Sequence, residues 1–116
     1  MKITNYNKVP GHRYKGSGPE GILARVVIGK TDGADHFCMR VLEFSPGAHS
    51  LRHSHDWEHE MFVHAGAGEV YGNRGWTALQ SGSVVFIPGH EEHQIRNLCQ
   101  EPLIVVCLIP SGAPEI

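Results

Sequence analysis

Short apolar runs separated by turn residues extend along the whole chain, and no segment shows helical apolar spacing over a convincing length. The runs are rich in β-branched and aromatic residues, and glycine, proline, asparagine or aspartate lies between them. The predicted strands lie at residues 21–30, 36–44, 60–66, 83–88, 93–97 and 103–110, with a hairpin at residues 68–79. About eight short strands without a helix are typical of an all-β sandwich or a small barrel.

The pattern within two of these runs indicates how they are buried. Residues 36–44 are apolar on both faces apart from Arg40 and Glu43, which is typical of a strand covered on both sides. Residues 83–88 are almost continuously apolar and end at proline, which predicts a short buried strand.

The run at residues 60–66 alternates, and His59 stands directly before it. Successive side chains of a strand point to opposite faces. If His59 faces the interior, Met61 and Val63 should do so too, and Phe62 should lie on the outside.

The length of the chain favours one domain, because 116 residues lie within the usual range of about 50–250 residues for a domain. Residues 1–20 combine glycine and proline with polar residues and are expected to form an N-terminal arm or irregular lead-in. We expect a β-barrel domain at residues 21–110 and a C-terminal tail at residues 111–116.

Charge and composition exclude several classes of function. The net charge of −2 and the scattered lysines and arginines give no electrostatic case for nucleic-acid binding. No apolar stretch approaches the roughly 20 residues of a membrane span, and the polar start lacks the apolar core of a signal peptide. Three widely spaced cysteines without a CxxC pair argue against a disulfide framework. A cytoplasmic location is therefore expected.

Candidate chemistry concentrates in the stretch HSHDWEH, which places His53, His55 and His59 within seven positions, with His93 far downstream. On a strand, residues at i and i+2 share a face, so His53 and His55 should point into one space. Neutral imidazole is the commonest protein ligand of transition metals. The spacing therefore predicts a metal site.

The residues around these histidines resemble the first motif of the cupin superfamily. Gly47 is followed after five residues by His53-x-His55, after three more by His59, and after six more by Gly66. Most cupins have a glutamate at the position that His59 holds here.

A second segment resembles the second cupin motif. Gly82 is followed after five residues by Pro88, then by His93 and three residues later by Asn97. The usual glycine two residues after the proline is replaced by His90. The two motifs stand in the expected order, and the resemblance covers about residues 37–110.

The acidic position of the first motif leaves two assignments. Glu60 is an alternative to His59, but the six-residue gap to Gly66 fits His59, and strand alternation puts Glu60 on the opposite face. An all-histidine site is similar to that of small single-domain cupins of the cupin 2 type. This resemblance implies one divalent transition metal (Mn, Fe, Ni, Cu or Zn) held by His53, His55, His59 and His93.

The same resemblance implies a cupin jelly-roll, or double-stranded β-helix, barrel with the metal inside near one mouth. Four neutral ligands would leave the full +2 charge on the ion, so we expect attraction for anionic or chelating oxygen ligands. Octahedral coordination would leave two positions free, whereas zinc closed by four histidines would be structural.

Two further pocket positions each have two interpretations. Arg40, a single cation in an apolar strand, could bind a carboxylate or form an ion pair with Glu43 or Glu60, and we favour the ion pair. Cys107 shares a face with Val105 on the last strand, which lines the pocket in cupins. It is either a packed apolar residue or a reactive thiol at the pocket.

Three residues near the ligands in sequence are also candidates. Trp57 could shield the metal from solvent or anchor the fold by packing. His49 and Glu58 are candidate hydrogen-bond partners for the ligands, which metal-bound histidines usually need.

The leading hypothesis is a metal-dependent oxidoreductase of dioxygenase type acting on a small enediol, catechol or β-dicarbonyl-like substrate. The alternatives are a metal-dependent isomerase or lyase, a non-catalytic small-molecule-binding or sensing module, and a purely structural metal. Small cupins pair through a sheet face, and Phe62 should project outward, so we also expect a homodimer.

Overall fold

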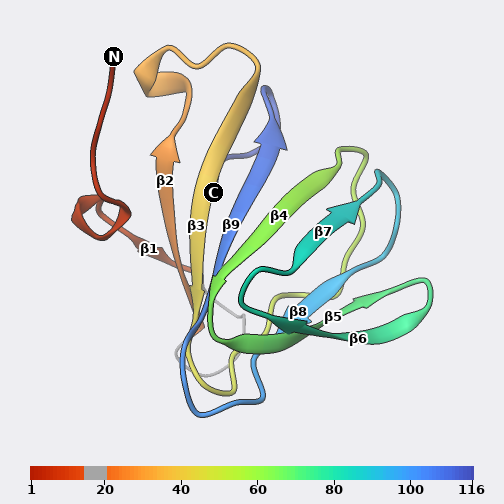
Figure 1. The fold of residues 1–116 in the computed structure, drawn as a ribbon. Coiled ribbons are helices and arrows are strands. Elements are labelled where there is room, and N and C mark those ends of the chain that lie inside the picture. Colours follow the sequence, from red (N-terminus) through yellow and green to blue (C-terminus); the bar gives the residue numbers. More distant parts are fainter. Residues whose placement is uncertain (15–20) are drawn as a thin grey trace.

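The computed structural model describes residues 1–14 and 21–116 (Figure 1). Its strands are β1 His12–Arg13, β2 Ile22–Ile28, β3 Phe37–Phe44, β4 His59–Ala65, β5 Ala67–Gly72, β6 Gly75–Gln80, β7 Val84–Ile87, β8 Gln94–Arg96 and β9 Leu103–Pro110. Two short 3-10 helices, η1 Tyr6–Lys8 and η2 Lys30–Asp32, are the helical elements of these residues. The prediction of an all-β chain is confirmed.

The strands form two antiparallel sheets. The larger has the order β1-β2-β3-β9-β4-β7 and the smaller the order β6-β5-β8. Figure 1 shows the smaller sheet lying next to β4 and β7. At the tight turn between β4 and β5, Gly66 has a φ of 85°, and an added Cβ would collide with the Pro102 carbonyl, so only glycine fits there.

The apolar core collects the inward side chains of the strands. Its buried members are Ile22, Ala24, Cys38, Leu42, Phe44, Ala48, Met61, Val63, Leu79, Ile87, Ile95, Leu103, Val105, Cys107 and Ile109. Along β4 the pattern alternates as predicted, with His59, Met61 and Val63 buried and Phe62 exposed.

The prediction of a buried strand at residues 83–88 is wrong. In β7, Val84 is 79% exposed and Phe86 is 60% exposed. β7 is the edge strand of the larger sheet and, among the described residues, pairs with β4. Val84 and Phe86 lie on the sheet face that carries the exposed Phe62, although the sequence of β7 is almost continuously apolar.

The predicted N-terminal arm contains regular structure in its described part. β1 pairs with β2 through His12 and Arg13, and η1 precedes it. Residues 15–20 of the predicted arm lie outside the described residues. Among the residues described, no helix is both long and apolar enough to cross a membrane.

Candidate metal centre

The four predicted histidines come together from three segments. His59 begins β4 and His93 directly precedes β8. His53 and His93 form an isolated antiparallel bridge, in which each backbone N–H donates to the other's carbonyl at 3.1 and 2.9 Å. His55 lies outside this bridge, and the chain bends at residues 56–57 before β4, so strand alternation is not what brings the rings of His53 and His55 together.

The imidazoles nevertheless form one cluster. Ring centroids lie 4.7 Å apart for His53 and His93, 4.7 Å apart for His55 and His59, and 5.1 Å apart for His59 and His93. His53, His55 and His93 each offer a nitrogen atom, and these atoms lie within 4.8 Å of one another. The Nε2 atom of His59 lies 2.9 Å from Nε2 of His55, which adds a fourth nitrogen at the edge of this group.

Backbone carbonyls orient two of the rings. Nδ1 of His55 lies 2.8 Å from the Trp57 carbonyl, and Nδ1 of His93 lies 2.8 Å from the Glu91 carbonyl. A carbonyl only accepts, so each Nδ1 carries the proton, and in the neutral ring each Nε2 keeps a lone pair that can bind a cation. This fixed tautomer is the arrangement that metal-binding histidines usually have.

One direct observation indicates that the four histidines suit a metal ion. His93 is only 4% exposed, and its Nε2 atom has no hydrogen-bond partner in the described part of the chain. Buried acceptors in folded proteins nearly always have a partner, so this lone pair calls for one. A cation held between the rings would supply it.

The protonation preferences of the cluster agree with ligand chemistry. Burial, followed by the charge of Arg40, lowers the pKa of His59 to about 3. Burial also lowers the pKa of His53 and of His55. These three rings therefore favour the neutral form, which is the form that binds a metal.

The turn before His93 accounts for the departure from the second motif. His90 has a φ of 72°, a left-handed conformation that glycine adopts far more readily, which explains why glycine is usual at this position. Its backbone N–H donates to the His55 carbonyl at 2.6 Å. The strained residue thus ties the second motif to a predicted ligand of the first.

A pocket of about 250 Å³ contains the histidine cluster. Of the other predicted site residues, Arg40, Trp57 and Cys107 line it, whereas Val105 is packed in the apolar core and is not part of the lining. The indole of Trp57 stacks on His55 with centroids 4.0 Å apart and an interplanar angle of 7°. Trp57 therefore covers one of the predicted ligands and also packs against the core.

The favoured ion pair of Arg40 with Glu43 or Glu60 is wrong. Glu43 lies an odd number of residues along β3, on the opposite face, and pairs with Arg25 at 3.3 Å. Glu60 lies on the exposed face of β4. Arg40 instead donates from Nη2 to Cys107 Sγ at 3.1 Å and from Nη1 to the Tyr14 hydroxyl at 3.5 Å.

Cys107 joins Arg40 to the histidines. Its Sγ atom lies 3.4 Å from Nδ1 of His59. Burial raises the pKa of the Cys107 thiol, so the residue favours a neutral S–H, which does not support a reactive thiolate.

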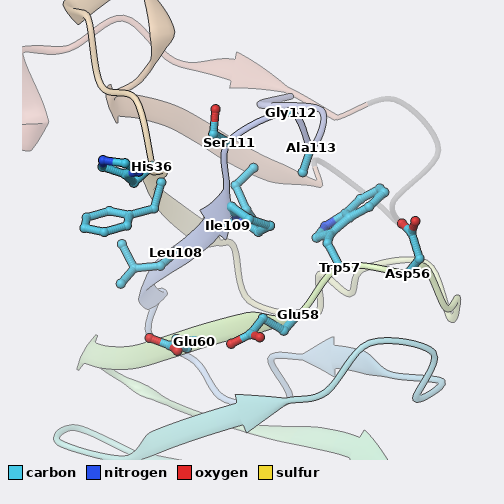
Figure 2. Close-up of a pocket in the computed structure, with 12 residues that line it drawn as sticks. His36, Asp56, Trp57, Glu58, Glu60, Leu108, Ile109, Ser111, Gly112 and Ala113 are labelled. Atoms are coloured by element: carbon cyan, nitrogen blue, oxygen red, sulfur yellow. The ribbon is translucent and has the colours of Figure 1, made fainter.

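His49 and Glu58 lie away from the cluster. His49 bridges to Arg96 on the backbone, and its ring Nδ1 lies 3.1 Å from the Ser50 carbonyl. Glu58 lines a separate pocket of about 710 Å³, where Figure 2 shows it on the same side as Glu60. Neither residue lines the histidine pocket.

The structure adds pocket residues that the sequence did not reveal. Tyr14 comes from the predicted arm, and Pro114 and Ile116 come from the predicted tail. These residues reach the pocket through contacts between distant parts of the chain, so no local sequence pattern indicated that they would line it. Leu42 could have been found, because it follows Arg40 by two residues on the same strand face.

Comparison with known proteins agrees with this geometry. Residues 40–109 match the Cupin_2 family, described as a cupin domain. A curated relative, 1-methylthio-D-xylulose 5-phosphate methylsulfurylase from Rhodospirillum rubrum, is 29% identical over 98 residues, covering 84% of this chain and 62% of the relative. The chain thus spans less than two thirds of that relative's length.

Two solved structures are similar over nearly the whole chain. The polyketide cyclase RemF from Streptomyces resistomycificus has a TM-score of 0.89 at 26% identity, covering 98% of this chain and 82% of that chain. A cupin-2 domain protein from Rhodospirillum rubrum has a TM-score of 0.81 at 25% identity, covering 97% and 76%. The two sheets are therefore those of a cupin jelly-roll barrel, and the chain belongs to the Cupin_2 family.

Proposed function

We propose that this protein is a small metal-dependent cupin enzyme in which His53, His55, His59 and His93 hold one divalent transition metal. The observation that carries the proposal is the buried Nε2 atom of His93 that lacks a partner. Leaving a buried polar atom unsatisfied costs about 1–3 kcal/mol. The lone pairs of His93 and His55 face a shared space, where an ion would remove that cost.

The residues suit Mn, Fe, Ni, Cu or Zn, because imidazole binds all of these ions. When bound, such an ion supplies Lewis-acid polarisation of a substrate oxygen or, for a redox metal, electron transfer. The chain's own residues supply the surroundings. Trp57 covers His55, and the apolar side chains of Leu42, Phe44 and Met61 limit water in the pocket.

For the reaction, we infer an oxidation of dioxygenase type on a small organic molecule with neighbouring oxygen atoms, such as an enediol, a catechol or a β-dicarbonyl. Four neutral ligands leave the ion's positive charge uncompensated, which favours an anionic or chelating substrate. The pocket volume of about 250 Å³ suits a small molecule rather than a polymer.

The test measures oxygen consumption by the iron-, manganese- and nickel-loaded protein with a panel of these three substrate classes. We expect oxygen uptake with at least one class, abolished in His59→Ala and retained in His64→Ala. His64 is the matched control because it lies on the same strand but on the exposed face. A metal-loaded protein that binds panel members without consuming oxygen would contradict the oxidation.

Metal-assisted isomerisation or lyase chemistry is the second candidate. Two of the three proteins named above are a polyketide cyclase and a methylsulfurylase, and neither name denotes an oxygenase. Anaerobic conversion of a carbonyl substrate, followed by proton NMR, would support this candidate. Metal binding without any turnover would instead favour a ligand-sensing module or a structural ion.

A further inference from the structure

Arg40 is a buried cation in the wall of the histidine pocket. Its residue is 7% exposed, and it lines the pocket that contains the four imidazoles. The pocket lining is otherwise mainly apolar outside the histidine cluster. A buried charge in such a place is costly unless a counter-charge or several hydrogen bonds compensate it.

The described residues do not provide that compensation. The Nη2 atom of Arg40 donates to the Cys107 thiol at 3.1 Å, and its Nη1 atom donates to the Tyr14 hydroxyl at 3.5 Å. The Nε atom of Arg40 is buried and has no hydrogen-bond partner among these residues. No carboxylate in the described part of the chain lies within ion-pair distance of the guanidinium.

The register of the sheet places this cation beside the candidate metal centre. Arg40 on β3 stands opposite Cys107 on β9, and Cys107 stands opposite Met61 on β4. Directly opposed residues of antiparallel strands point to the same face. Cys107 Sγ therefore lies between the guanidinium and Nδ1 of His59, at 3.1 and 3.4 Å. One small molecule in the pocket can reach both the guanidinium and the imidazole cluster.

We propose that Arg40 binds the carboxylate of a small organic acid whose apolar body fills the histidine pocket. A guanidinium presents Nε and a terminal nitrogen along one edge, and a carboxylate accepts from such an edge through two parallel hydrogen bonds. The acid neutralises the buried charge, satisfies the free Nε atom and places its apolar part against Leu42, Phe44 and Met61. The inference depends on the proposed function only in taking this pocket as the substrate site.

The test uses the metal-free 116-residue chain at pH 8, with benzoate as the probe and benzamide as its uncharged match, by isothermal titration calorimetry. We expect benzoate to bind at least about tenfold more tightly than benzamide, since hydrogen bonds to a charged group contribute about 1.5–3 kcal/mol. Arg40→Met should abolish that preference, and Arg40→Lys should retain only part of it. Arg74→Met, at an exposed turn position, is the matched control and should leave both affinities unchanged.

A thermal melt separates ligand binding from a structural role. Replacing a buried uncompensated charge by an apolar residue of similar volume is often neutral or stabilising, so Arg40→Met should melt no lower than the unmodified protein without ligand. Equal affinity for benzoate and benzamide would overturn the proposal, as would unchanged benzoate binding in Arg40→Met or Arg40→Lys. The absence of metal in this experiment keeps its outcome independent of the turnover tests above.

Discussion

The Nε2 atoms of His55 and His59 lie 2.9 Å apart, although the two residues belong to different parts of the chain around the bend at residues 56–57. Two nitrogen ligands at about 2.1 Å from one ion and at right angles to each other are about 3.0 Å apart. The separation thus suits two ligands of one ion. In the metal-free protein the same distance suits a hydrogen bond, with His59 as donor because His55 carries its proton on Nδ1.

Removing His59 should weaken metal binding. We expect His59→Ala to lower the affinity for Ni²⁺ or Zn²⁺ at least about 100-fold, more than the tenfold to 100-fold typical of losing an outer partner. Glu60→Ala should leave the affinity unchanged, because Glu60 lies on the exposed face of β4. Isothermal titration calorimetry and elemental analysis measure both. If Glu60→Ala lost the metal and His59→Ala kept it, the assignment of the fourth ligand would be reversed.

Acid should destabilise the metal-free protein through the same cluster. The pKa of His59 falls from 6.5 to about 3 on folding, so between these values the unfolded chain binds a proton that the folded chain does not. Stability is therefore full above pH 6.5 and is lost as the pH falls toward 3, by at most about 1.4 kcal/mol per pH unit for this one group. The lowered pKa values of His53 and His55 act in the same direction.

Urea unfolding of metal-free protein between pH 7.5 and pH 4 checks this dependence. His59→Gln should flatten the decline, because glutamine does not titrate, whereas His64→Gln should not. An unchanged slope in His59→Gln would show that other groups dominate the acid sensitivity.

The sequence predicted the grouping of the four histidines better than the residues that surround them, for physical reasons. The spacing of His53, His55 and His59, together with a motif containing His93, was sufficient to group the four rings, although His55 does not lie on a strand. Strand alternation alone gave the buried face of β4. Histidine spacing and strand alternation are local patterns, and the local geometry of the backbone decides which way such side chains point.

What the sequence missed depends on strand order and register. Arg40 meets Cys107 across 67 residues of chain, and only the pairing of β3 with β9 shows that the cation faces the pocket rather than an acidic residue. Likewise, Val84 and Phe86 of β7 lie on an exposed face of the larger sheet, opposite Phe62 and Glu60 of β4, which the apolar sequence of β7 does not indicate.

Asn97 should matter for stability rather than for binding. It is fully buried, its Nδ2 donates to the carbonyls of Phe44 and Glu101 at 3.0 and 2.8 Å, and its Oδ1 accepts from the Cys99 N–H at 2.9 Å. Asn97→Ala leaves these three backbone groups without partners, and each unsatisfied group costs about 1–3 kcal/mol. We expect a loss of about 2–4 kcal/mol in urea unfolding.

Metal affinity provides the control for Asn97. In Asn97→Ala protein that remains folded, Ni²⁺ binding should change less than threefold, because no contact joins Asn97 to the histidine rings in the described residues. A large loss of metal with little loss of stability would contradict the structural role.

The outer face of β4 and β7 is the surface on which we expect a second copy of the chain to dock. Phe62 is 48% exposed and stands opposite Val84, and Phe86 stands opposite Glu60 on the same face. A two-fold axis through this face would bury the three apolar side chains against their own counterparts.

Phe62→Glu should therefore weaken the homodimer at least about tenfold, because it places a carboxylate in an apolar contact. Leu98→Glu, at an exposed apolar position outside the strands, should leave it intact. Light scattering at micromolar concentration measures both, and the mass of a single chain for the unmodified protein would refute the dimer.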